Sequence, residues 1–258
     1  MDLPQAEIIE LTEAKSLLES PGFSSKITNL ISKPIEYGFK KMPKGSVEKI
    51  NKVCEKTLEK VFYFTFKGGG TSKHLNHSRE WWDEIGIMAT GAIGGFVGLP
   101  ALIVELPVSV SLIMQSISGI ASNYGEDLSS AESKLSCIEV LHLGSDREDK
   151  NYLDKRLEMD GVIKEASDYI ASEGFSDIEN PKIKDFLSKV SSKFSITASD
   201  MAVIDILPMI GDITGATVNV LFMLHFQNTA KGHFIIRKLE RKYGGEIVHK
   251  AYKEISLA

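Results

Sequence analysis

One run of the sequence is almost free of charge. Over the 41 residues 85–125, Glu105 is the only charged residue, and it divides the run into two uncharged halves. Each half has the roughly 20 residues that a helix needs to cross the hydrocarbon core of a bilayer. The first half also contains five glycines and Pro100, and Pro107 follows Glu105. Because proline and glycine interrupt helices, we expect a bent or hairpin-like apolar unit and not one long straight helix.

A second sparsely charged block spans 201–230 and is interrupted by Asp205 and Asp212. As in the first block, an acid stands shortly before a proline, here Asp205 before Pro208. We expect the two blocks to pair in space, whether or not they share an origin.

Small residues recur at four-residue spacing inside both blocks. The pairs are Gly91 with Gly95, Gly94 with Gly98, and Gly211 with Gly215. On a helix this spacing lines a groove where another backbone can approach closely, as it does between membrane helices and in soluble bundles. We therefore predict that the blocks fold against one another and leave a surface or hollow for apolar material. The residues that this hypothesis assigns to contact with a hydrophobic ligand or a membrane are Gly91, Gly94, Gly95, Gly98, Glu105, Pro107, Asp205, Pro208, Gly211, Asp212, Gly215 and Asn219.

Three acids lie in otherwise apolar sequence: Glu105, Asp205 and Asp212. An ionised carboxylate in such surroundings costs free energy unless it is paired, hydrogen-bonded or wet. The first interpretation places these acids at helix starts or turns, where they accept bonds from backbone amides. The alternative collects them with His142 or His225 in a metal or acid–base site.

Helical periodicity recurs along the chain, and sustained strand alternation does not. Two apolar faces with helical spacing are Val47, Ile50, Cys54, Leu58 and Val61, and Ile183, Phe186, Leu187, Val190 and Phe194. Capping-box patterns at 129–132 and 197–200 predict two helix starts, and Gly125 and Gly244 predict two helix ends. We predict an all-α fold, a single helical domain with two central Gly-rich apolar helical hairpins packed by amphipathic helices.

Composition excludes several classes of function. The net charge of −5 is the difference between a basic region, 26–67, and an acidic one, 126–190, so nucleic acid is not expected as a partner. The chain has no P-loop, no dinucleotide-binding glycine fingerprint and no nucleophile elbow, so no cofactor is predicted. Cys54 and Cys137 have no CxxC spacing and are expected to be reduced core residues. The N-terminus lacks the pattern of a secretory signal, which favours a cytoplasmic location.

Basic residues accompany the apolar blocks. They are Lys40, Lys41, Lys44, Lys49, Lys52 and Lys56 before the first block, and Lys231, Arg237, Lys238, Arg241 and Lys242 after the second. Lysine and arginine near an anionic bilayer each contribute about 1 kcal/mol of attraction. The combination favours a protein that rests at the inner face of a membrane, although either basic stretch alone is also typical of a solvated helix face.

The ordered features resemble the EcsC family. The residues that carry the resemblance are Lys33-Pro34-Ile35-Glu36, Met42-Pro43, 91–95, Leu106-Pro107, 117–127, 207–211, Gly215-Ala216, Asn219, Phe222, Ala230 and Tyr243-Gly244. The resemblance implies a helical domain over 26–250, preceded by a helical extension, 1–25, and followed by a short tail, 251–258. It also implies association with membranes or transport systems, and it supplies no catalytic residues.

Three functions follow as expectations. The first is a non-enzymatic helical module that binds lipid or another apolar ligand, or docks on a membrane, through the two blocks. The second is a metal-assisted hydrolase that uses Glu105, Asp205, Asp212 and a histidine, which requires these groups to converge. The third is a scaffold for a membrane transporter or protease, with a membrane protein as its partner.

Overall fold

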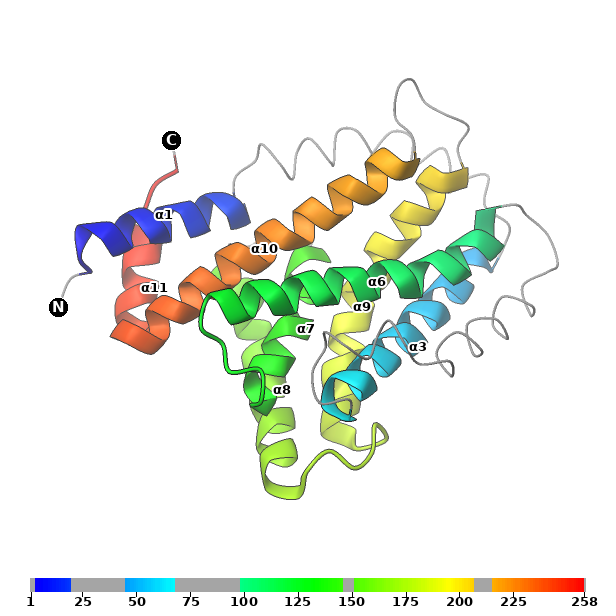
Figure 1. The fold of residues 1–258 in the computed structure, drawn as a ribbon, viewed down its shortest axis with the longest axis horizontal. Helices are drawn as coiled ribbons and strands as arrows, with labels where there is room; N and C mark the ends of the chain where they lie inside the picture. The colour runs from blue at the N-terminus through cyan, green and yellow to red at the C-terminus, as the bar shows by residue number, and fades with distance from the viewer. Residues whose placement is uncertain (1–2, 20–44, 68–97, 146–150, 207–214, 258) are drawn as a thin grey trace.

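The computed structural model describes residues 3–19, 45–67, 98–145, 151–206 and 215–257, and helices account for nearly all of them (Figure 1). The helices are α1 (Gln5–Glu19), α3 (Ser46–Lys67), α6 (Gly98–Asn123), α7 (Ala131–Ser145), α8 (Tyr152–Glu173), α9 (Pro181–Ile206), α10 (Gly215–Tyr243) and α11 (Gly245–Glu254). No β-strand occurs within these ranges. The predicted all-α fold is therefore confirmed.

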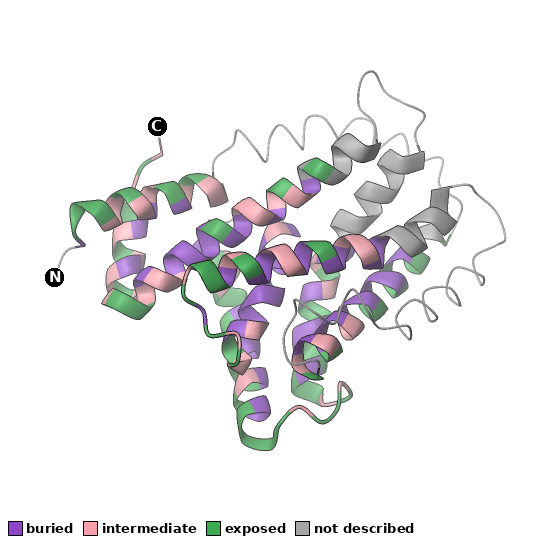
Figure 2. Ribbon diagram, viewed as in Figure 1, coloured by how far each residue is buried: buried purple, intermediate pink, exposed green. Residues whose placement is uncertain are grey.

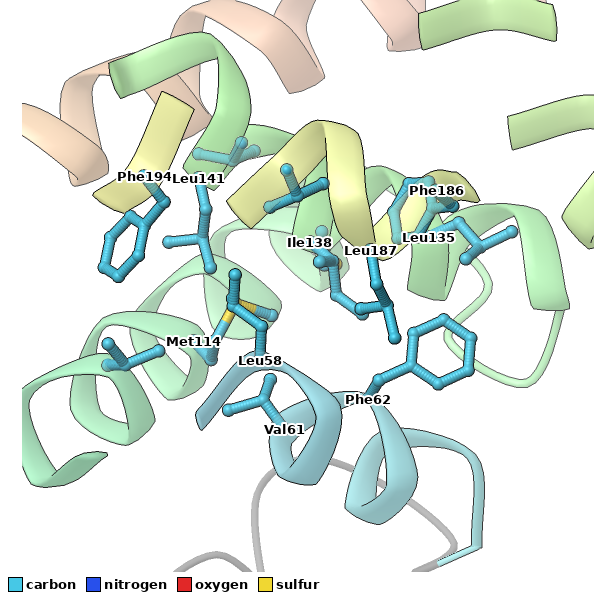
Figure 3. Packing of buried hydrophobic residues seen from close by; sticks show 14 of the residues in the cluster. Leu58, Val61, Phe62, Met114, Leu135, Ile138, Leu141, Phe186, Leu187 and Phe194 are labelled. Atoms are coloured by element: carbon cyan, nitrogen blue, oxygen red, sulfur yellow. The ribbon is translucent and has the colours of Figure 1, made fainter. Parts of the chain in front are cut away.

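The main hydrophobic core surrounds α7. Eleven of the 15 residues of α7 are buried, so this helix is enclosed on all sides by its neighbours. Figure 3 shows side chains from α3, α6, α7 and α9 meeting in this core. They include Phe62 of α3, Met114 of α6, Leu141 of α7 and Phe194 of α9, each no more than 1% exposed.

The amphipathic faces predicted for α3 and α9 are confirmed. On α9, all five predicted apolar residues are buried, and on α3 only Val47, in the first turn, is exposed (Figure 2). The segment 61–67, which carries several β-prone aromatic residues, continues α3 as helix. Helical spacing therefore predicted the structure of this segment correctly.

A second, smaller core joins the two ends of the chain. Leu11 of α1, Ile236 and Leu239 of α10, and Val248 of α11 are all fully buried in it. Ion pairs reinforce the docking of α1: Lys238 Nζ donates to Glu10 Oε1 at 2.6 Å. The helix at the N-terminus is thereby held against the C-terminal half of α10.

Two helix-start predictions are corrected by the structure. Residues 197–200 lie inside α9, which runs uninterrupted to Ile206. The cap of α7 is Ser130, whose Oγ accepts a bond from Ser133 N at 3.1 Å, so the predicted box at 129–132 is shifted by one residue. Gly125 and Gly244 adopt the positive φ angles, 80° and 87°, that were expected at helix ends.

Pro107 also lies inside a helix and not at a turn. It is the tenth residue of α6, where its missing amide removes one backbone hydrogen bond. The carbonyl of Pro107 accepts a bond from Ser111 Oγ at 2.7 Å, and both residues are buried against the core. Burial of this part of α6 offsets the cost of the proline, so the break that the sequence favoured does not form here.

Gly232 allows α1 to approach α10 closely. A Cβ atom at this position would lie 2.6 Å from Leu18 Cγ and 3.0 Å from the carbonyl oxygen of Ala14. Because the second contact is with backbone, we expect Gly232→Ala to lower the free energy of unfolding by about 1–3 kcal/mol. The control is Gly161→Ala on α8, where no atom lies within 4 Å and alanine is expected to stabilise the helix by up to about 1 kcal/mol. Urea unfolding of both variants checks this; equal effects would contradict the proposed close approach.

Candidate functional site

The two sparsely charged blocks reach the same end of the molecule. Figure 1 shows α3, α6 and α10 beginning, and α9 ending, at this end, and α6 packs against each of the other three helices. A hydrogen bond from Gln227 Nε2 to Ser116 Oγ, 2.9 Å long, joins α10 to α6. The predicted pairing of the two blocks is therefore confirmed for the parts carried by α6 and α10.

The part of α6 that follows Glu105 has no charged residue. From residue 106 to residue 125 every side chain is uncharged, yet α6 lies at the surface and Leu112 is 44% exposed. On α10, which packs beside it, Val220 and Leu224 are 58% and 41% exposed and follow each other by one helical turn. Gln227 and Ser116, which bond to each other, lie one turn further along the same two helices. We call Leu112, Val220 and Leu224 the α6–α10 apolar face.

The structure locates only part of the predicted contact set. Six of its residues lie outside the described ranges: Gly91, Gly94, Gly95, Pro208, Gly211 and Asp212. Five others occupy helical backbone whose side chains are not placed: Gly98 and Glu105 in α6, Asp205 in α9, and Gly215 and Asn219 in α10. The twelfth, Pro107, is buried. Glu105 and Asp205 thus lie within helices and not at their starts.

The two histidines of the hydrolase alternative make structural contacts. His142 Nδ1 donates to the carbonyl of Lys189 at 3.3 Å, and His225 Nε2 donates to that of Gly144 at 2.6 Å. These bonds tie α7 to α9 and α10. In the part of the chain that is described, no three histidine, cysteine or acidic side chains gather as they would around a metal ion.

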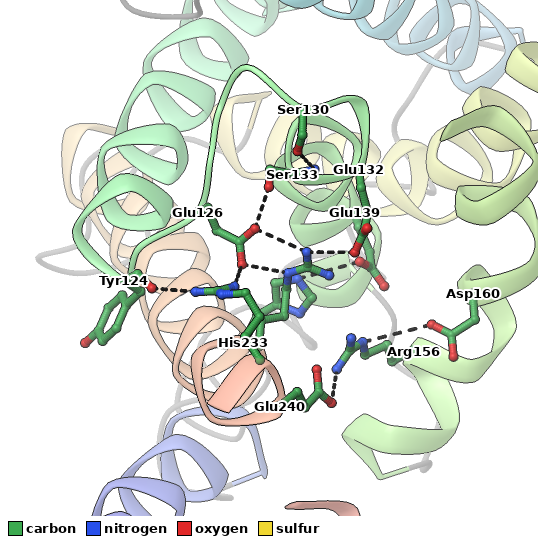
Figure 4. A network of polar contacts seen from close by, with 12 residues as sticks. Tyr124, Glu126, Ser130, Glu132, Ser133, Glu139, Arg156, Asp160, His233 and Glu240 are labelled. Carbon is green, nitrogen blue, oxygen red and sulfur yellow. Dashed lines mark hydrogen bonds and ion pairs between the residues drawn. The ribbon is translucent and has the colours of Figure 1, made fainter. Parts of the chain in front are cut away.

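A buried polar network lies between α7, α8 and α10 (Figure 4). Its first centre is Glu126, whose side chain is 2% exposed. Arg237 Nε and Ser133 Oγ donate to this carboxylate at 2.9 and 2.6 Å, and Arg241 also donates to it. Burial opposes ionisation of Glu126, but the bonds from Arg237 and Ser133 outweigh it and lower its pKa. The loop between α6 and α7 is thereby fixed to α10.

The second centre joins Glu139, His233 and Tyr152, none of which is more than 3% exposed. His233 Nδ1 shares a hydrogen bond with Tyr152 Oη at 2.8 Å, and His233 Nε2 lies 3.6 Å from Glu139 Oε2. Burial is the main cause of both pKa shifts: it raises the pKa of Glu139 to about 7 and holds that of His233 well below 6.5. A carboxyl, an imidazole and a phenol in a row can exchange protons, but here they are sealed from solvent and hold three helices together.

One protein-family model matches the part of the sequence that contains α6 to α9 and most of α10. The EcsC protein family model matches residues 86–239, more than half of the chain. The chain belongs to the EcsC family. No curated protein and no solved structure was found to match it.

The EcsC match includes some of the helices and leaves others out. Glu126, Glu139, Tyr152, His233 and Arg237 all lie within the matched residues, so the centre of the buried network is part of the EcsC domain. Helices α1, α3 and α11 lie outside the match.

Four of the five basic residues predicted on α10 form ion pairs within this EcsC-family protein, although Lys238, Arg241 and Lys242 remain 42%, 40% and 58% exposed. Arg237 and Arg241 bind Glu126, while Lys238 and Lys242 bind Glu10 and Glu7 of α1. Sequence reasoning missed this because no local pattern shows which acids reach α10; Glu126 precedes Arg237 by 111 residues. No helix in the described ranges is both long and apolar enough to cross a membrane.

Proposed function

We propose that this EcsC-family protein is a non-enzymatic helical module that associates with a membrane surface at the inner face of the bilayer, through the α6–α10 apolar face. The observation that carries the proposal is the outward face of α6, which lacks charge over five turns and continues onto Val220 and Leu224. Water-exposed helix faces of folded proteins normally carry charged residues. A contiguous uncharged face with exposed leucines is typical of a surface that contacts apolar material.

The same face also explains why the apolar blocks contain so few charges. Residues that only pack in the core need apolar side chains on one side of a helix, and the other side is free to be polar. From Leu106 onward, both sides of α6 are uncharged. A bilayer in contact with the outer side supplies the physical reason, because a charged side chain there would have to be desolvated.

Liposome flotation with two matched double variants tests the proposal. We expect the wild-type protein to float with vesicles and Leu112→Glu/Leu224→Glu to bind at least about tenfold more weakly, because each substitution removes apolar contact and adds a charge repelled by anionic lipid. The control is Ile9→Glu/Leu157→Glu, which adds the same charge elsewhere on the surface. Ile9 on α1 is 63% exposed, and Leu157 on α8 is 70% exposed. We expect the control to bind like the wild type.

Two results would contradict the proposal. One is that the wild-type protein floats with neither neutral nor anionic vesicles and that native mass spectrometry detects no bound lipid. The other is equal loss of binding in the two double variants, which would mean that any added charge has the same effect.

A further inference from the structure

Helix α3 carries a continuous row of lysines outside the EcsC match. Lys49, Lys52, Lys56, Lys60 and Lys67 follow one another by three, four, four and seven residues, which places them along one face of the helix. The row extends over about 27 Å at the helical rise of 1.5 Å per residue. Four of the five are exposed, and Lys60 is half-buried.

The acids of α3 lie on a different flank. Burial and the charge of Glu55, one turn away, raise the pKa of Glu59, while the charge of Lys56 opposes this shift. Glu179 and Lys184, near the start of α9, also act on Glu59. In the described part of the chain, no ion pair within 4.0 Å joins an acid to Lys49, Lys52 or Lys56, whereas four basic residues of α10 form such pairs. The lysines therefore form an exposed positive face, while Glu59 lies on the side of α3 that is near the start of α9.

Neighbouring lysines of this row repel one another. The charge of Lys56 and the partial burial of Lys60 lower the pKa of Lys60, burial being the larger cause. Like charges one turn apart destabilise a helix by a few tenths of a kcal/mol per pair. Tyr63 lies in the same row, 37% exposed, with Lys67 Nζ 4.9 Å from the centre of its ring. An aromatic side chain among lysines is typical of helices that lie at the boundary between water and lipid.

The geometry points to the lysine row of α3 as the docking surface for anionic lipid head groups. This inference rests on the proposed membrane association and adds the lipid class and the helix that selects it. Helix α6 packs against α3 on one side and α10 on another, and α3 and α6 begin at the same end of the molecule (Figure 1). The helix that carries the lysine row therefore packs beside the uncharged part of α6, so one surface can present both attraction to head groups and apolar contact. A flat bilayer suits a straight row of this length better than a small anion does.

Sedimentation with vesicles of two compositions tests the inference on the full chain. We expect tighter binding of the wild type to vesicles that contain phosphatidylserine than to pure phosphatidylcholine, and a decrease of that binding at high salt. Lys52→Glu/Lys56→Glu is expected to weaken binding to the anionic vesicles by about 25-fold or more, from about fivefold per lysine. Lys164→Glu/Lys250→Glu, which changes net charge equally at exposed lysines of α8 and α11, is the control and is expected to keep most of the binding. Circular dichroism spectra confirm that both variants are folded.

The possible outcomes separate the inference from the proposed function. Equal binding to both vesicle types, or equal loss of binding in the two variants, would contradict the role of the lysine row and leave the proposed membrane association standing. No binding to either vesicle type would overturn both. Binding of duplex DNA at the same salt concentration completes the test. If Lys52 and Lys56 are needed for DNA binding and the protein binds no vesicles, the lysine row serves a nucleic acid and the inference is overturned.

Discussion

Replacing Arg237 with methionine is expected to destabilise the protein by about 3 kcal/mol, a large effect for one side chain. Arg237 makes two of the bonds to Glu126, from Nε to Oε1 at 2.9 Å and from Nη2 to Oε2 at 3.2 Å. Without them, a carboxylate that is 2% exposed keeps only Ser133 and Arg241 as partners. The cost arises because burial of a charge is tolerable only while the charge is paired.

Lys238 provides the control on the same helix. Its ion pair with Glu10 joins side chains that are 42% and 26% exposed, so Lys238→Met is expected to cost less than about 1 kcal/mol. The double variant Glu126→Gln/Arg237→Met should regain part of the stability lost in Arg237→Met, because it leaves no buried charge without its main partner. Urea unfolding followed by circular dichroism measures all three. A loss for Arg237→Met no larger than that for Lys238→Met would contradict the role assigned to the network.

Glu139→Gln is expected to change how stability depends on pH. Burial raises the pKa of Glu139 from 4.5 to about 7, so between these values the unfolded chain has released this proton and the folded protein retains it. The unfolded state then binds fewer protons, and stability decreases as pH rises through this window. Relative to Glu139→Gln, the wild type should lose about 3 kcal/mol of unfolding free energy between pH 4.5 and pH 7.

The charged neighbours of Glu139 set the design of this experiment. Arg156 and Asp160 face it from α8, and Arg237, His233 and Glu240 face it from α10. The low pKa of His233 changes the pH dependence of stability in the opposite direction. Below pH 6.5 the imidazole is protonated in the unfolded chain but not in the folded protein, so stability falls as pH falls. Comparing two proteins that both contain His233 removes that contribution. Parallel stability curves for wild type and Glu139→Gln from pH 4.5 to 8 would show that Glu139 ionises in the folded protein as it does in the unfolded chain.

Sequence periodicity was sufficient to predict the buried faces of α3 and α9. The spacing of Ile183, Phe186 and Phe194 reports which side of α9 is buried, because core packing selects apolar residues at every turn. The expected helix break does not occur at Pro107. The cost of one missing hydrogen bond is local, but the burial that offsets it comes from helices distant in sequence. The predicted helix start at 197–200 was wrong for the same reason, because a local capping pattern does not show that tertiary packing continues α9 through these residues.

The candidate site was predictable in outline and not in detail. The lack of charge in 85–125 and 201–230 indicated that the blocks pair, and α6 and α10 do pack. No local sequence pattern connects Glu126 with Arg237 or Tyr152 with His233, because these pairs are separated by 111 and 81 residues. Basic residues near an apolar block therefore had two interpretations, and the structure assigns internal pairing to α10 and an exposed row to α3.

A fluorescent label at Leu112 tests membrane contact by the α6–α10 apolar face most directly. Leu112→Cys is exposed enough to react with an environment-sensitive dye, whereas Cys54 and Cys137 are buried and burial raises the pKa of each thiol to about 12, which suppresses labelling. Leu157→Cys on α8, at a side chain that is 70% exposed, is the matched control. On addition of anionic vesicles, the account predicts a blue shift and slower aqueous quenching for the label at 112 and no change at 157. An unchanged spectrum at 112 under conditions where the protein sediments with the vesicles would contradict it.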